Sequence, residues 1–215
     1  MKKIRKIIII LLIILIVLLI GYIVYDKCFN KEEEPIKVEK RIDDYGYTLD
    51  ENETNIYKEE FYNLEKILES SEVDYEAYAK SIAKLFIIDF YTLDNKLSKN
   101  DIGGVEFLKP SMRDNFIEQA RSTFYKYVEV KKGRTQKLPI VSSVDDIELE
   151  KTTYTIKKIT KTTSKKGKTP TNVGDIKEAY KLNISWSYKE DLGYEDTTTM
   201  YMIKENDKLY IVEMN

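Results

Sequence analysis

The chain contains no histidine and only one cysteine among its 215 residues. Histidine is the commonest metal ligand in proteins and the commonest general base near neutral pH, so its absence excludes a histidine-dependent hydrolase. A single cysteine allows no disulfide within the chain and no cysteine-rich zinc or iron–sulfur site. We therefore expect no metal site, no cofactor and no catalytic residues of the familiar kinds.

The one cysteine, Cys28, lies just after a long apolar run at residues 7–25. The residues before it, Tyr25, Asp26 and Lys27, are not the small residues that precede a lipoprotein cleavage site. Two interpretations stay open. Cys28 is either a thiol at the membrane edge without a role, or it forms an intermolecular disulfide between two copies of the chain.

The chain also lacks an excess of basic residues, with 35 Lys and Arg against 37 Asp and Glu. Four of the basic residues precede the apolar run, so the rest of the chain carries a net charge of about −6. A nucleic-acid-binding domain needs a basic surface that displaces counterions from phosphates, so we expect no nucleic-acid partner. The abundance of Ile, Lys, Asn and Tyr is typical of an AT-rich, bacterial coding sequence.

The apolar run from Ile7 to Tyr25 contains no charged residue, and its 19 residues would span about 28 Å as a helix. No small-x-small cleavage site follows it, so the pattern predicts an uncleaved transmembrane signal anchor. Lys and Arg cluster in residues 1–6, which favours a cytoplasmic tail and an extracytoplasmic remainder. We therefore expect a single-pass protein of the cell membrane, in contact with the lipid bilayer.

A charged segment with little apolar periodicity follows the predicted span. Pro35 and Gly46 interrupt it, and its glutamate run is typical of a solvated tether. The sequence therefore predicts a polar stalk at 26–53 and one extracytoplasmic domain at 54–215, which is long enough for a single core.

Three segments of this domain have apolar residues at helical spacing. The predicted helices cover about 55–69, 74–95 and 111–128. Asp74 is placed to begin the second helix, and Pro110 suits the first turn of the third. The apolar stripe of the third helix is Met112, Phe116, Ala120, Phe124 and Tyr127.

Beyond residue 133 the apolar period changes from helical to alternating. Residues 180–188 alternate strictly, with Tyr180, Leu182, Ile184, Trp186 and Tyr188 on one face and polar side chains on the other. One or two earlier strands are indicated at about 144–156, and two later strands at 197–204 and 209–214, with turns at 191–193 and 205–208. The sequence predicts an α+β fold in which three helices pack on a curved antiparallel sheet of four to five strands.

This order of elements, together with the segment from Phe90 through Leu93 to Gly103 and Gly104, resembles the nuclear-transport-factor-two-like fold that ketosteroid isomerase shares. The resemblance covers about residues 55–215 and implies a cone-shaped domain with a pocket at its mouth. A single span followed by such a domain is also similar to certain bacterial conjugative-transfer and secretion scaffolds, and to domains appended to cell-wall enzymes.

Asp89 is the candidate functional residue because it lies on the apolar stripe of the second predicted helix. A buried carboxylate requires partners or has a raised pKa. Asp89 is therefore either a structural residue satisfied by a tyrosine, a lysine or a backbone donor, or an acid in a ligand pocket with Tyr78, Phe86 and Trp186. No position of the family's catalytic residues can be matched here, so the resemblance carries over no catalytic role.

Several other features have a functional and a structural interpretation. The acidic pairs Asp43-Asp44 and Asp145-Asp146 suit a hard cation, but solvated turns are favoured. The 17 tyrosines and Trp186 suit stacking platforms, but core packing is favoured. The basic segment from Lys165 to Lys168 suits an anionic polymer or lipid headgroups, but an ordinary charged loop is favoured.

Three functions are compatible with these features. The favoured hypothesis is a non-enzymatic scaffold or assembly subunit of a bacterial envelope complex of the transfer or secretion kind, with an envelope protein or a second copy as partner. The alternative is an extracytoplasmic ligand-binding or sensory domain with a pocket in the cone. An isomerase-like or hydrolytic enzyme is the least favoured.

Overall fold

The structure, a computed structural model, describes residues 12–22, 36–156 and 174–215 of a chain that divides into two units, Met1–Pro35 and Ile36–Asn215. In the first unit, residues 12–22 form a helix whose apolar side chains are exposed. Within the described ranges, no helix is both long and apolar enough to cross a membrane. The ends of the predicted span at 7–25, the predicted tail at 1–6, Cys28 and the basic segment around Lys165 lie outside the described residues.

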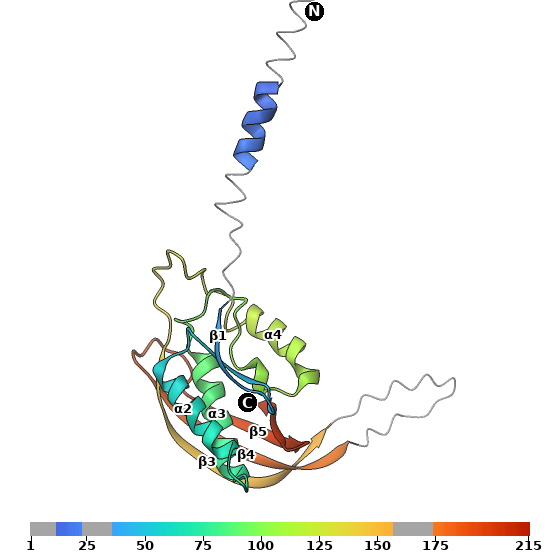
Figure 1. The fold of residues 1–215 in the computed structure, drawn as a ribbon. Helices are drawn as coiled ribbons and strands as arrows, with labels where there is room; N and C mark the ends of the chain where they lie inside the picture. Colours follow the sequence, from blue (N-terminus) through green and yellow to red (C-terminus); the bar gives the residue numbers. More distant parts are fainter. Residues whose placement is uncertain (1–11, 23–35, 157–173) are drawn as a thin grey trace, which may run out of the picture. The chain divides into compact units, whose positions relative to one another are not determined.

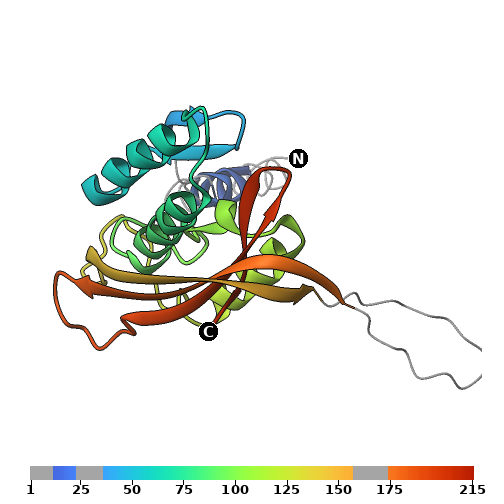
Figure 2. The ribbon, with the colours of Figure 1, turned by 90° about the horizontal axis from the view of Figure 1, so that it is seen from below.

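The second unit is an α+β fold with two antiparallel sheets, which confirms the predicted class (Figure 1). Strands β3 to β6 form the larger sheet in sequence order; helix α3 packs on one face of it, and α2 packs on the far side of α3 (Figure 2). The elements are β1 (Val38–Ile42), β2 (Tyr47–Asp50), α2 (Asn55–Leu68), α3 (Tyr75–Tyr91), the short 3-10 helices η1 (Val105–Phe107) and η2 (Pro110–Met112), α4 (Arg113–Ser122), β3 (Val141–Ile156), β4 (Asp175–Tyr188), β5 (Thr197–Glu205) and β6 (Lys208–Met214).

Helices α2 and α3 agree with the sequence pattern. The hydroxyl oxygen of Thr54 accepts a hydrogen bond from the Tyr57 N–H, and the Asp74 carboxylate accepts from the N–H groups of Glu76 and Ala77. These side chains satisfy amide groups that have no partner inside the first turn of each helix. The apolar stripe of α2, formed by Tyr57, Phe61, Leu64 and Leu68, is buried, and α3 is buried nearly all round because it lies between α2 and the sheet.

The third predicted helix is wrong in length. It was expected to run to residue 128, but α4 ends at Ser122, where the hydroxyl of Thr123 donates back to the carbonyl oxygen of Gln119 at 2.7 Å. The chain then leaves helical geometry, so the apolar stripe does not continue. Tyr127, expected in the stripe, is exposed, whereas Tyr125 is fully buried.

The predicted strands are confirmed, with one difference. The segment at 144–156, where one or two strands were expected, is a single 16-residue strand, β3, that pairs with β4 along its length. The turn between β5 and β6 falls at Asn206 and Asp207, both at positive φ, inside the predicted turn at 205–208. Asn and Asp tolerate this left-handed backbone better than most residues.

The predicted stalk at 26–53 requires a correction. Its described part belongs to the folded unit: β1 and β2 form a hairpin, and Tyr47 and Leu49 are completely buried in the main core. Gly46, interpreted as a breaker, has a φ of +65° in the hairpin turn, where a side chain would be strained. The alternation of Tyr47 and Leu49 was hidden because β1 is mostly exposed and charged.

Two tyrosine hydroxyls attach this hairpin to the rest of the unit. The hydroxyl groups of Tyr47 and Tyr78 lie 2.7 Å apart, and the N–H of Leu209 donates to the Tyr78 hydroxyl at 3.4 Å. The contact joins β2, α3 and the first strand residues after the β5–β6 turn. Buried hydroxyls that are paired in this way avoid the cost of losing water.

Replacing Leu49 with alanine tests whether the hairpin belongs to the core. We expect Leu49→Ala to lower the free energy of unfolding by about 2–5 kcal/mol, because it leaves a cavity among buried side chains. Urea denaturation measures the change. The exposed Arg41→Ala on the paired strand is the control and should change stability by less than about 0.5 kcal/mol. Equal, small effects of both variants would restore the stalk interpretation.

Candidate functional site

Three of the four predicted pocket residues are packed core residues. Tyr78 and Phe86 are completely buried, and Trp186 is 2% exposed. Phe86 stacks on Phe90 with the ring centroids 5.4 Å apart, and Trp186 packs on Tyr91 at 4.5 Å. The structure does not bring these three side chains together with Asp89 around one cavity, because aromatic neighbours fill the space beside each of them.

Asp89, the fourth predicted residue, has both a partner and a cavity. One carboxylate oxygen pairs with the ammonium group of Lys96, and the other accepts a hydrogen bond from the Gly104 N–H at 2.6 Å. The side chain of Lys96 is 3% exposed and that of Asp89 is 13% exposed. Two of the partners considered from sequence, a lysine and a backbone donor, therefore satisfy Asp89 together.

The two adjacent glycines allow the loop after residue 100 to approach α3 closely. A Cβ atom added to Gly103 would lie 2.4 Å from the backbone oxygen of Asp89, and one added to Gly104 would lie 2.6 Å from the Phe86 ring. Gly104 also has a φ of +74°. Only glycine fits this approach without displacing α3, so the glycine pair is what lets the loop backbone donate to Asp89.

A second carboxylate, from the residue before α2, joins the same cluster. Glu53 has a side chain that is 8% exposed, and its carboxylate lies 3.8 Å from the Lys96 ammonium group. The Asn95 side-chain amide donates to Glu53 at 3.3 Å and to the backbone oxygen of Asn52 at 3.4 Å. The Asn52 amide donates in return to the Asn95 backbone oxygen, so the segments before α2 and after α3 are joined reciprocally.

A third carboxylate belongs to η1. One oxygen of Glu106 accepts hydrogen bonds from the backbone N–H and the hydroxyl of Thr48, each at 3.0 Å. The other oxygen, Oε1, is buried and has no hydrogen-bond partner among the described residues. Glu106 therefore links η1 to the N-terminal hairpin and keeps one unpaired acceptor in the interior.

These groups surround a small acidic cavity of about 160 Å³ between the hairpin, α3 and η1. We call it the acidic cavity; it is lined by Thr48, Asp50, Glu53, Tyr57, Asp89, Ile102, Gly104, Val105 and Glu106. Four of these residues carry carboxyl groups, and Lys96 is the cation that pairs with two of them. Fully ionised, the cluster would hold an excess of buried negative charge, which is unfavourable in a medium of low polarity.

The excess negative charge is reduced because Glu53 and Glu106 bind protons more tightly than exposed glutamates do. Burial, together with the charge of Asp89, raises the pKa of Glu53 to about 8, and burial raises the pKa of Glu106 to about 7. Burial alone would lower the pKa of Lys96, but Asp89 and Glu53 outweigh it, so the net pKa of Lys96 is raised and the lysine stays charged. Near neutral pH the cluster therefore contains the Asp89–Lys96 ion pair beside two glutamates that titrate.

The acidic cavity does not have the geometry of a metal site. Within the described part of the chain, no group of three or more acidic, cysteine or histidine side chains is arranged to hold a metal ion. Asp43 and Asp44 lie in the β1–β2 turn, and Asp145 accepts hydrogen bonds from the hydroxyls of Ser143 and Ser187, each at 2.5 Å. Those serine hydroxyls lower the pKa of Asp145. Asp145 and Asp146 are exposed but lie in strand β3, so the turn predicted at this acidic pair is wrong.

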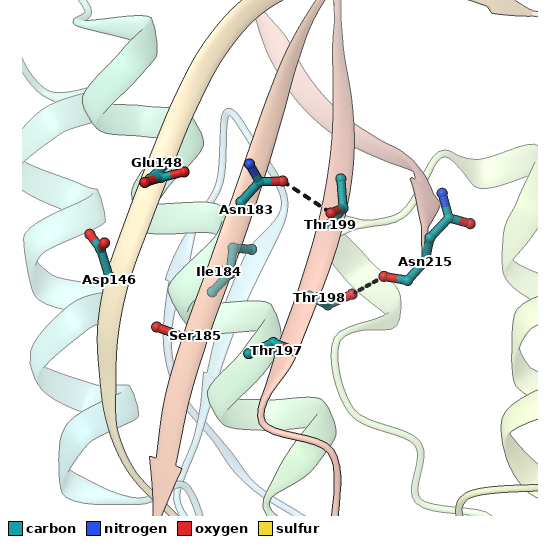
Figure 3. Close-up of a pocket in the computed structure, with 9 residues that line it drawn as sticks. All are labelled: Asp146, Glu148, Asn183, Ile184, Ser185, Thr197, Thr198, Thr199 and Asn215. Atoms are coloured by element: carbon teal, nitrogen blue, oxygen red, sulfur yellow. Dashed lines mark hydrogen bonds between the residues drawn. The ribbon is translucent and has the colours of Figure 1, made fainter.

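A larger polar concavity lies on the face of the sheet that points away from α2 and α3 (Figure 3). Its volume is about 380 Å³, and the outer polar concavity, as we call it, is lined by Asp146, Glu148, Asn183, Ile184, Ser185, Thr197, Thr198, Thr199 and Asn215. The Thr199 hydroxyl donates to the Asn183 side-chain oxygen at 3.0 Å, which orients the amide. Carboxylates on β3 thus stand beside amide and hydroxyl groups on β4 and β5.

Only one part of this concavity could be predicted from the sequence, the polar face of β4. The alternation at 181–187 predicted a polar face on β4, but the pairing that places Glu148 opposite Asn183, and Asn183 opposite Thr199, depends on strand register. Register between distant strands could not be read from one sequence.

Comparison with known proteins gives no match: no protein-family model fits the chain, and no curated protein and no solved structure is significantly similar to it. The resemblance to the nuclear-transport-factor-two-like fold therefore stays a prediction. The coarser α+β class rests on the structure itself.

Because the pKa of Glu53 is raised, we predict that the free energy of unfolding depends on pH. The folded state keeps a proton on Glu53 that the unfolded chain releases near pH 4.5, so the free energy of unfolding should fall as pH rises from about 4.5 through about 8. Glu53→Gln cannot ionise, so it should be more stable than the unchanged chain at pH 9 by more than about 1 kcal/mol. Urea denaturation from pH 5 to 9 measures this. The exposed Glu51→Gln is the control, and parallel pH profiles for all three proteins would contradict the account.

We also predict that the buried Lys96 contributes strongly to the free energy of unfolding. Lys96→Met leaves Asp89 without its counter-ion in the interior, and we expect a loss of about 3–5 kcal/mol in the free energy of unfolding. The matched control is Lys84→Met, because Lys84 pairs with Glu60 at 3.4 Å but is 38% exposed, and such pairs contribute about 0–1 kcal/mol. A similar small loss for both lysines, measured by thermal and urea denaturation, would show that the Lys96 pair does not hold the cluster together.

Proposed function

We propose that this chain is a single-pass membrane protein whose folded unit lies outside the membrane and acts as a non-enzymatic docking module, a scaffold or assembly subunit of a bacterial envelope complex. The uncharged run at 7–25 and the basic residues before it support the membrane placement and the orientation. The described part of that run, residues 12–22, is a helix whose apolar side chains are about half or more exposed, as expected of a surface made for lipid.

The observation that carries the docking function is the position of the outer polar concavity. It lies on the sheet face opposite the helices, and it presents exposed or half-exposed carboxylate, amide and hydroxyl groups from neighbouring strands (Figure 3). The opposite face, where a cone-like pocket would open, is filled by Tyr78, Phe86 and Trp186. Polar groups that are already fixed by a rigid sheet can bind a partner with little loss of conformational entropy.

A second candidate, a ligand-binding or sensory domain, is favoured by the acidic cavity. The unpartnered Oε1 atom of Glu106 is a buried acceptor that a small cationic or hydrogen-bonding ligand would satisfy. The cavity is small, and Asp89 already has two partners, so this function ranks below docking.

In-cell photo-crosslinking tests the docking function. A photoreactive residue in place of Thr197, an exposed residue of the outer polar concavity, should give one discrete adduct with the same envelope protein in repeated experiments. The same residue in place of Glu118, exposed on α4, is the control and should give little of that adduct. The adduct should be recovered with the membrane fraction.

Two results would contradict this function. Equal capture of many proteins from both positions would show non-specific contact, and capture of nothing but the chain itself would replace a heterologous partner by self-association. Adding Glu106→Gln separates the second candidate, because the amide oxygen can still accept from Thr48 while the unpartnered acceptor is replaced by a donor. Docking should persist in that variant, whereas a function based on the acidic cavity should not.

A further inference from the structure

The larger sheet has one covered edge and one free edge. At β6, residues Leu108 and Ile211 form a parallel bridge, and the Lys109 N–H donates to the Ile211 oxygen at 3.1 Å. At β3, the N–H of Val141 donates to the Thr92 hydroxyl at 3.1 Å, and beyond it no backbone hydrogen bond joins residues 142–156 to any described segment other than β4. The free edge therefore runs from Ser142 to Ile156, the end of β3.

The free edge is long and regular. The β3–β4 register shifts between Val141 and Ser143 and between Val144 and Asp146, and from Asp146 to Ile156 it is unbroken. Natural proteins protect an edge by bulges, short length, proline or charge. Beyond Asp146, β3 has no bulge and no proline, so charge is the protection that remains.

The charge on this edge has one sign on one face. Asp146, Glu148 and Glu150 lie at alternate positions, opposite Ser185, Asn183 and Lys181 of β4, and therefore share the outer face of the sheet. All three are exposed, and none forms an ion pair with another described residue. By contrast Lys151, on the other face, pairs with Glu76 at 2.7 Å. We call these three carboxylates the acidic row.

The negative charge of the acidic row favours the addition of a strand with basic side chains and disfavours one with acidic side chains. In the register centred on Glu148, an antiparallel second copy of the same segment would place Asp146 opposite Glu150 and Glu148 opposite itself, and like charges directly opposite each other are destabilising. A strand with lysine or arginine at alternate positions would instead place one basic side chain opposite each carboxylate of the acidic row. Its backbone would satisfy the N–H and C=O groups that β3 directs outward.

We propose that the free edge of β3 binds an extended, lysine- or arginine-bearing segment of a partner protein by strand addition, with its basic side chains over the acidic row. The segment needs at least five residues, because Asp146 to Glu150 spans about 13 Å of strand. Its side chains would lie beside the outer polar concavity, which Asp146 and Glu148 also line. This inference rests on the proposed docking function and names the chemistry of the partner.

A synthetic peptide tests the inference on the 215-residue chain in nanodiscs of zwitterionic lipid. The probe is a labelled eight-residue peptide that alternates lysine and valine, and fluorescence anisotropy measures its dissociation constant. Neutralising the acidic row with Asp146→Asn, Glu148→Gln and Glu150→Gln should weaken binding by about tenfold, the effect of three cross-strand charge pairs. The matched control, Glu59→Gln, Asp114→Asn and Glu118→Gln on the helices, removes the same charge and should stay within about twofold.

A second peptide separates strand addition from simple charge attraction. The same peptide with an N-methyl group on every residue keeps its charge but has no backbone N–H to donate along either edge, so it should not bind measurably. The inference is overturned if the N-methylated peptide binds as well, if the two triple variants behave alike, or if no peptide binds. It is also overturned if sedimentation shows a dimer that the acidic-row variant abolishes, because a second copy would then occupy the edge. A partner captured from Thr197 without any peptide binding would leave the docking function standing and remove this inference alone.

Discussion

The buried ammonium group of Lys96 is the interaction on which the rest of the folded unit depends. Removing a charge from water costs several kcal/mol unless close counter-ions and hydrogen bonds replace the solvent. Here Asp89 from α3 and Glu53 from the segment before α2 lie around one lysine that is 3% exposed. The chain can bury this charge only when α3, the loop after it and the start of α2 are all in place.

That requirement extends to the sheet through a short series of contacts. Asp89 also accepts from the Gly104 N–H, and η1 follows directly, where Glu106 accepts from Thr48 of the N-terminal hairpin. The residues just after η1 then cover β6 through Leu108 and Ile211. The charge cluster is thus connected, through η1, to the segment that covers β6. The other edge, β3, carries the acidic row and has no second strand paired with it among the described residues.

The sequence predicted those parts of the fold that depend on local periodicity. Helices α2 and α3 have strong apolar patterns and clear N-caps, and strand β4 has a strict alternation. Their predicted positions agree with the structure to within a few residues. The N-terminal hairpin was missed because its burial depends on Tyr78, a residue 31 positions away from Tyr47. The predicted length of α4 was wrong because the backbone leaves helical geometry at Thr123, where φ is −120° and ψ is −93°.

The candidate site shows the same division between local and distant information. Asp89 was identified because it interrupts an apolar stripe, and the structure places it in a charge cluster beside a cavity. Its aromatic neighbours on that stripe proved to be core, since large side chains at helical spacing pack against other elements. Glu106 had no local signal, because Thr48 and Glu106 are 58 positions apart and meet only in the folded chain.

Native-state hydrogen exchange of the folded unit tests the central claim most directly, that one buried charge cluster makes the hairpin, α2 and the sheet a single cooperative body. The account predicts that the slowest amides of β2, α2 and β4 exchange with the same free energy of opening, equal to that of global unfolding. If the amides of β2 and α2 exchanged together at a much lower free energy while β4 stayed protected, the hairpin and α2 would be a separate, weakly held layer. The Lys96 cluster would then not be what holds the unit together.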